Sequence, residues 1–209
     1  MFSNLNATDI ILLLLSIVVS LVIHETMHGY MAFWLGDDTA MEAGRLSFNP
    51  LKHIDPLTTI IMPAVLIIIT GIPFLAAKPV PFNPNRVKYG EYGAALVGII
   101  GPLTNLALAV IAAIFFRLFF KNLGSLAYQA VIIFAEVNVA MFIFNMIPFP
   151  PLDGSRLLYA FAPEPLRELM AKIEAAGFIT ALFIIFLLFY VISGPIYNLE
   201  NGLMQLLFG

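Results

Sequence analysis

The sequence predicts an all-α polytopic membrane protein with about four to six transmembrane helices. Hydrophobic residues make up 61% of the 209 residues and charged residues only 11%, against about 45–50% and 25% in soluble domains. Apolar runs long enough to cross a bilayer recur along the chain, separated by polar or proline-rich segments. The length and the lack of an internal repeat favour a single domain over residues 1–209.

Composition also excludes several classes of function. The net charge is −3 and no basic run is present, so nothing indicates a nucleic-acid partner or strong attraction to anionic lipid. The absence of cysteine excludes a thiol nucleophile, a disulfide framework and cysteine-ligated zinc. The first apolar run lacks a basic leader and a small-residue cleavage site, so we expect it to be retained as a span.

The first predicted helix is followed by a polar loop and a second apolar stretch. Thr8 and Asp9 are suitable for an N-cap, and the helix should run to about Leu35 and end at 36–38. Residues 37–56 are rich in turn residues and predict a hairpin or re-entrant loop, which is allowed at membrane depth only where protein covers it. Residues 57–75 are apolar but interrupted by prolines and a glycine, so they either span or re-enter.

A third helix is predicted over residues 94–120. Small residues and one asparagine recur along it at steps of three and four, which predicts a face for close helix packing: Ala94, Gly98, Gly101, Asn105 and Ala109.

The chain after residue 124 predicts two more spans and a break between them. A fourth helix over 125–146 runs into prolines at 148–151, which a helix cannot continue through. The mixed segment 163–177 has apolar residues on one side and charges on the other, typical of a short interfacial helix. A fifth helix over 178–192 should end at 193–195, followed by a short apolar tail.

Within the first helix lies a His-Glu-x-x-His motif, His24-Glu25-x-x-His28. Residues four apart project from the same helical face, so the two imidazoles suit Zn²⁺. Glu25 is placed to take a proton from a metal-bound water. Such motifs arise by chance on exposed helices, but ionisable residues at membrane depth each cost about 2.5–3.5 kcal/mol. The location therefore favours a metal site over an accidental match.

A catalytic zinc needs a third protein ligand and an open position. Asp153 stands out because the broken backbone before it is tolerated at membrane depth where it lines a cavity. Spacing alone leaves an equal alternative, an N-cap for the segment 154–160. His53 fits a loop histidine bonded to backbone better than a ligand. The full set of candidates for the third ligand is Glu42, His53, Asp55, Glu136 and Asp153.

Two asparagines lie seven residues apart on one face of the fourth predicted helix. For Asn138 we favour interhelical hydrogen bonding, which is worth about 0.6 kcal/mol on average in membranes. Asn145 adjoins the proline break, so it could hold the substrate backbone or a developing oxyanion. Glu136 faces another direction, and we expect only a polar partner on a neighbouring helix.

Five motifs together resemble the site-2 proteases, zinc metalloproteases that cut substrates within the membrane. The resemblance runs from His24 to about Arg156. It rests on His24-Glu25-x-x-His28, Gly44-Arg45-Leu46-Ser47-x-Asn49-Pro50 with His53-x-Asp55-Pro56, Lys78-Pro79-Val80-Pro81, Gly101-Pro102-x-x-Asn105, and Asn145-x-x-Pro148-x-Pro150-Pro151-Leu152-Asp153-Gly154. One small departure is Ser155, where the family usually has a second glycine.

The resemblance implies a set of roles. His24, His28 and Asp153 would bind one zinc ion, Glu25 would be the general base, and Asn145 would assist near the scissile carbonyl. The similarity is to compact prokaryotic members without PDZ or CBS modules, so neither module is expected here. It implies a multi-pass protein of the prokaryotic cell (inner) membrane.

The implied activity is hydrolysis of peptide bonds within or near transmembrane segments, either in regulated proteolysis or in clearing signal-peptide remnants. Expected partners are transmembrane or signal-peptide-like substrates and the lipid bilayer, without nucleic acid; the oligomeric state is not predicted. One alternative is an inactive scaffold that binds such substrates. Another is a metal or proton transporter, which would need ionisable groups through the full membrane depth. Basic residues divide almost evenly between alternate loops, so orientation is not specified.

Overall fold

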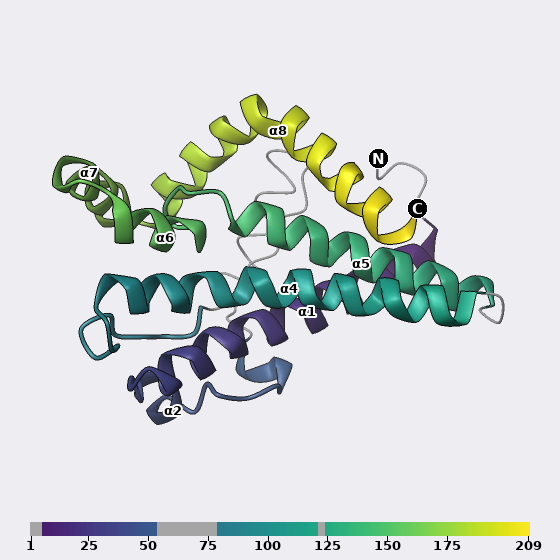
Figure 1. Ribbon diagram of the computed structural model, residues 1–209, viewed down its shortest axis with the longest axis horizontal. Coiled ribbons are helices and arrows are strands. Elements are labelled where there is room, and N and C mark those ends of the chain that lie inside the picture. Colours follow the sequence, from purple (N-terminus) through teal and green to yellow (C-terminus); the bar gives the residue numbers. More distant parts are fainter. Residues whose placement is uncertain (1–5, 54–78, 121–123) are drawn as a thin grey trace.

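The computed structural model describes residues 6–53, 79–120 and 124–209 (Figure 1). The elements assigned in this part of the chain are all helices. Three of these helices are long and apolar enough to cross a membrane: α1, α4 and α5. This confirms the predicted all-α membrane class. The second apolar stretch, 57–75, lies outside the described residues. The elements are α1 (Ala7–Trp34), α2 (Thr39–Glu42), η2 (Pro50–Lys52), α4 (Glu91–Phe119), α5 (Ser125–Asn145), α6 (Gly154–Phe161), α7 (Glu164–Ala175) and α8 (Phe178–Phe208).

The helix α1 begins with a capping box. The Asn6 side chain accepts from the Asp9 backbone N–H at 2.9 Å, and the Asp9 carboxylate accepts from the Asn6 N–H at 3.2 Å. The predicted N-cap at Thr8 and Asp9 was therefore wrong, because Asp9 is the acidic third residue of this motif and Asn6 is the cap. The other end is close to the prediction: α1 ends at Trp34, one residue before Leu35.

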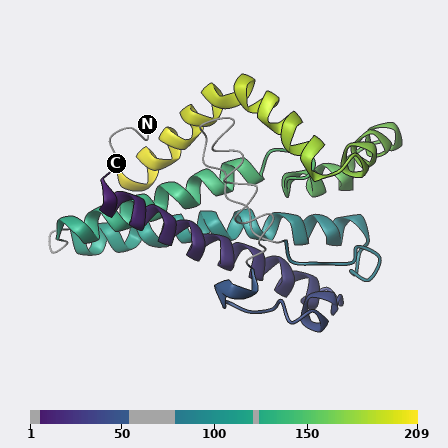
Figure 2. The ribbon, with the colours of Figure 1, turned by 180° about the vertical axis from the view of Figure 1, so that it is seen from behind.

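The central helix of the bundle is α4, which packs against α1, α5 and α6 (Figures 1 and 2). Its small-residue face is formed as predicted, since Ala94, Gly98, Gly101, Asn105 and Ala109 are all buried. Small side chains let neighbouring backbones approach closely. As a result, two imidazoles of α1 lie directly against the α4 backbone.

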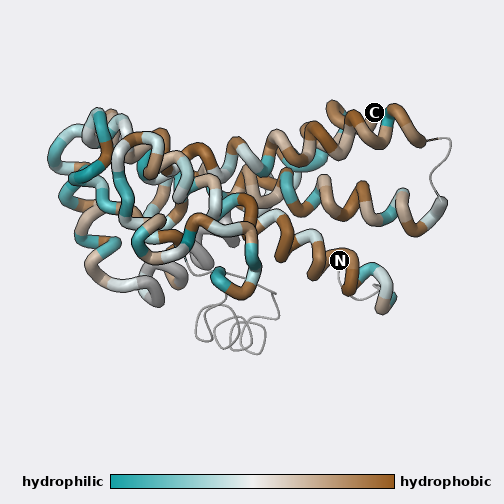
Figure 3. Tube along the Cα trace, turned by 90° about the horizontal axis from the view of Figure 1, so that it is seen from below, coloured by the Kyte–Doolittle hydropathy of each residue, from teal (hydrophilic) through white to brown (hydrophobic). Residues whose placement is uncertain are grey.

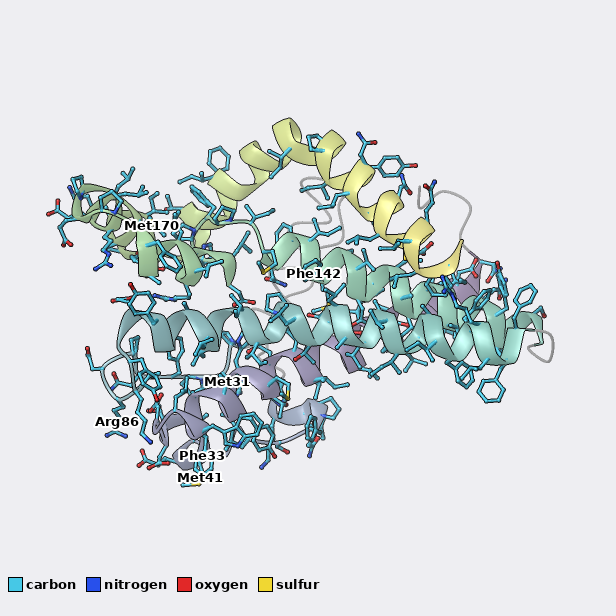
Figure 4. The ribbon with its side chains drawn as sticks, viewed as in Figure 1. Met31, Phe33, Met41, Arg86, Phe142 and Met170 are labelled. Carbon is cyan, nitrogen blue, oxygen red and sulfur yellow. The ribbon has the colours of Figure 1, made fainter. Side chains whose placement is uncertain are left out.

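The helix α8 packs on α5 and returns toward the end of the molecule where α1 begins (Figures 1 and 2). Ala109, Val139 and Ile143 form a buried core there, and Phe142 lies between α5 and α8 (Figure 4). The predicted end of the last helix at 193–195 was wrong, because α8 continues through Pro195. Proline kinks a helix without always ending it, and α8 is visibly bent (Figure 1).

Hydrophilic residues gather at the end of the molecule that carries α2, α6 and α7 (Figure 3). The predicted short helix over 163–177 is confirmed as α7, and Glu174 near its end lies 3.4 Å from the Arg156 guanidinium of α6. Residues 37–53, the described part of the segment predicted as a hairpin or re-entrant loop, contain the short helical turns α2 and η2. The Thr26 hydroxyl of α1 donates to the Ser47 carbonyl at 2.9 Å, so this loop is fastened to the helix that carries the motif.

Candidate metal centre

Three side chains from distant parts of the sequence converge beside α4. His24 and His28 lie one turn apart on α1, and their Nε2 atoms are 3.0 Å from each other. The Asp153 Oδ2 lies 3.0 Å from the His24 Nε2 and 3.3 Å from the His28 Nε2. Within the described residues these three form a group that could hold a metal ion.

The proline break after α5 brings Asp153 to the histidines. The chain turns between the end of α5 and the start of α6, and Gly154 lies so close to α5 that a Cβ there would be 2.5 Å from the Met146 carbonyl oxygen. Glycine is needed for this approach. Asp153 precedes α6 but makes no side-chain capping hydrogen bond, so its carboxylate is directed to the histidines rather than to the helix end.

Each imidazole is oriented by a hydrogen bond from its other nitrogen. The His28 Nδ1 lies 2.6 Å from the Val97 carbonyl oxygen, and the His24 Nδ1 lies 2.6 Å from the Asn105 Oδ1. Both oxygens can only accept, so each Nδ1 must carry the ring proton. In the neutral imidazoles each Nε2 is then a bare lone pair, as a metal ligand requires.

Three acceptor atoms that lie this close together repel one another unless a cation lies between them. With both Nε2 atoms unprotonated, the Asp153 Oδ2 has no donor, and it is buried without a hydrogen-bond partner. Zinc holds nitrogen and oxygen ligands at about 2.0–2.2 Å in a tetrahedron, so the ligand atoms are separated by roughly 3.3–3.6 Å. The observed separations of 3.0–3.3 Å fit such a site with little adjustment. Three protein ligands leave the fourth position for water or substrate.

Gly101 of α4 lies against both imidazoles. A Cβ there would be 2.4 Å from the His28 Nε2 and 2.7 Å from the His24 Cε1. We expect Gly101→Ala to raise the dissociation constant for zinc by at least about tenfold, as loss of an outer-shell partner does, because the methyl group would displace a ligand atom. Competition with a chelator in detergent measures this. The control is Gly194→Ala in α8, where the new methyl meets nothing within 4 Å; equal affinity in both variants would contradict the geometry.

The Glu25 carboxylate is held by the segment that begins at residue 79. Its Oε2 accepts from the Val80 backbone N–H at 2.8 Å. Val80 stands between Pro79 and Pro81, and proline has no N–H, so this is the one backbone donor that the three residues offer. Sequence reasoning missed this contact, although the alternation of prolines was a visible signal.

Three of the remaining candidates for the third ligand are not brought to the group. The His53 Nε2 lies 2.6 Å from the Ser47 carbonyl, which confirms the expected loop histidine bonded to backbone. Glu42 is at the surface, 3.7 Å from the Arg86 guanidinium, and Arg86 extends outward from its loop (Figure 4). Glu136 is exposed on α5, where its charge interacts with that of Glu200 on α8. Asp55 lies outside the described residues.

The two asparagines of α5 have different surroundings. Asn138 is fully buried and bonds to side chains of α1 and α4, which confirms its predicted interhelical role. Asn145 is the last residue of α5, and its Nδ2 donates to the Met141 carbonyl at 3.0 Å. Its catalytic role remains a prediction.

Comparison with known proteins identifies the kind of protein that carries this geometry. The chain is 37% identical to "Putative zinc metalloprotease YwhC" of Bacillus subtilis over 179 residues, which cover 81% of this chain and 78% of that protein. The chain belongs to the site-2 protease family. It is 30% identical to "Putative zinc metalloprotease MJ0611" of Methanocaldococcus jannaschii over 157 residues, covering 75% of this chain and 74% of that one.

The chain is also 29% identical to "Putative zinc metalloprotease Rip2" of Mycobacterium tuberculosis over 169 residues, covering 80% of this chain and 64% of that relative. No family model and no solved structure matches it. These similarities agree with the site, where three converging ligand atoms fit zinc. This member of the site-2 protease family is thus a zinc metalloprotease and a membrane protein.

Proposed function

We propose that this site-2 protease is an intramembrane endopeptidase, a multi-pass protein of the prokaryotic cell membrane that hydrolyses peptide bonds within or near transmembrane segments. The observation that carries this proposal is the position of the metal-binding group on α1. That helix is 28 residues long and apolar enough to cross a membrane, and its two histidines are buried. His28 is six residues from the end of α1, about 9 Å at the helical rise, so the metal-binding group lies inside the length of this apolar helix, which supports a site at membrane depth.

In this proposal His24, His28 and Asp153 hold one zinc ion per chain. When bound, zinc supplies a Lewis acid that polarises a peptide carbonyl and acidifies water. The Glu25 carboxylate follows the first ligand in sequence, and its hydrogen bond from Val80 keeps one oxygen fixed. Glu25 takes the proton from the attacking water and delivers it to the leaving amine.

Asn145 is the proposed polar contact for the scissile peptide. It occupies the last position of α5, where the backbone leaves the helix and turns toward Asp153. One Nδ2 hydrogen is used within its own helix, and the amide has a second hydrogen and a carbonyl oxygen to offer. An amide N–H directed at the carbonyl oxygen would stabilise the charge that develops there.

The two rival functions fit the structure less well. A transporter needs ionisable groups through the membrane depth, yet within the described parts of α1, α4 and α5 the buried ionisable side chains are His24 and His28 alone. An inactive scaffold would not require three potential ligand atoms to converge to within 3.0–3.3 Å of one another. The geometry therefore favours the protease.

A helix-breaking sequence in the substrate should speed cleavage, because a transmembrane helix hides its carbonyls in its own hydrogen bonds. We expect two glycines in place of leucines near the cut to raise kcat/KM about tenfold, since each glycine costs a helix about 1 kcal/mol. The measurement uses the protease and a single-span substrate in proteoliposomes, with the two glycines moved to the far end of the span as the control. Cleavage of soluble peptides alone would contradict the proposal.

A further inference from the structure

A network of buried hydrogen bonds links His24 to two neighbouring helices. Asn105 of α4 presents its Oδ1 to the His24 Nδ1 at 2.6 Å, and its Nδ2 donates to the Asn138 Oδ1 of α5 at 2.9 Å. The Asn138 Nδ2 donates to the Ser20 Oγ at 2.8 Å, so the hydrogen-bond network ends on α1. All four side chains are at most 3% exposed, so water does not compete for these bonds.

The donor-to-acceptor direction of these hydrogen bonds is fixed by a backbone carbonyl. The Asn138 Nδ2 also donates to the Phe134 carbonyl oxygen at 2.8 Å, and a carbonyl can only accept. The amide nitrogen of Asn138 must therefore face that carbonyl, and its oxygen must face Asn105. Asn105 then has to donate to Asn138, which leaves only its oxygen for His24.

This direction determines which nitrogen of His24 can bind a metal ion. Because the Asn105 Oδ1 can only accept, the single proton of a neutral His24 imidazole sits on Nδ1, which leaves the Nε2 that faces Asp153 at 3.0 Å as the nitrogen that can bind a metal ion. We propose that Asn105, held by Asn138, is a positioning residue that fixes the tautomer and ring orientation of His24 for zinc. This inference rests on the proposed function, because it takes His24 as a ligand.

A purely structural role for the same amides would have different consequences. Hydrogen bonds that only join α4 to α1 and α5 would affect the stability of the bundle, whichever nitrogen of His24 carried the proton. A positioning role instead makes zinc affinity depend on one feature, the acceptor oxygen at position 105. The two roles are separated by a variant that keeps this acceptor while losing the donor to Asn138.

Zinc affinity provides the first test, measured by chelator competition on purified, folded protein in detergent. We expect Asn105→Leu to raise the dissociation constant for zinc about 10–100-fold, the range for loss of an outer-shell partner. Asn105→Asp keeps an acceptor oxygen for His24 and should stay close to wild type. The control is Thr104→Val, because the Thr104 hydroxyl donates to Ile100 of its own helix at 2.7 Å. Wild-type affinity in Asn105→Leu would overturn the proposal.

The second test needs no variant to fold. The chain has only three histidines, so nitrogen-15 labelling of histidine gives few signals in the zinc-loaded wild type. We expect His24 to bind zinc through Nε2 and to carry a slowly exchanging proton on Nδ1. Zinc on the Nδ1 of His24 would overturn the proposal. A wild type that binds no zinc at all would overturn the proposed function itself, and this inference with it.

Discussion

Glu25→Gln should leave zinc bound and lower the rate of peptide hydrolysis by about 10²–10⁴-fold, the contribution typical of a general acid–base group. Glutamine matches glutamate in size, and its amide oxygen can still accept from the Val80 N–H that holds Glu25 at 2.8 Å. The fold and the metal site should therefore be preserved, while the group that exchanges a proton with water is lost. The measurement is turnover of a membrane substrate alongside zinc content.

The matched control for this substitution is Glu42→Gln. Glu42 is also a glutamate near α1 in sequence, but it is largely exposed and pairs with Arg86 at the surface. An exposed pair of this kind contributes at most about 1 kcal/mol, so turnover should stay at the wild-type level. Turnover retained in Glu25→Gln, with full zinc occupancy, would contradict the role assigned to Glu25.

Asp153→Ala should have the largest effect on the metal itself. It removes one of three ligand atoms and leaves two imidazoles, which is too few for a stable zinc site. Binding should become too weak to survive purification. His53→Ala should keep its zinc, because His53 is bonded to the Ser47 carbonyl and stands outside the group of three. Its substitution should lower stability only, through loss of the contacts between the loop and α1.

Local patterns were enough to predict much of the fold. The spacing of His24 and His28 placed both imidazoles on one face, and the apolar runs predicted α1, α4 and α5 to within a few residues. The small-residue face of α4 was likewise visible, because its members recur with the period of a helix. The end of α8 was predicted wrongly because a helix can accommodate a proline by bending, whereas the sequence rule treats it as a stop.

The site depended on information that spacing does not contain. Asp153 was as suitable for a helix cap as for a ligand, and only the turn after α5 decides which way its carboxylate points. Asn105 and Asn138 lie 33 residues apart, and no local pattern predicts that their amides meet. The resemblance to a family supplied the ligand set, but the direction of the hydrogen bonds comes only from the packed helices.

The zinc content of the purified protein, with Asp153→Ala and His53→Ala measured beside wild type, tests the metal centre most directly. We expect one zinc per chain in wild type, one in His53→Ala and little or none in Asp153→Ala. Such a result would establish the ligand set and justify a search for membrane substrates. Wild-type protein without zinc, even after the metal is added back, would contradict the metal centre and favour an inactive scaffold.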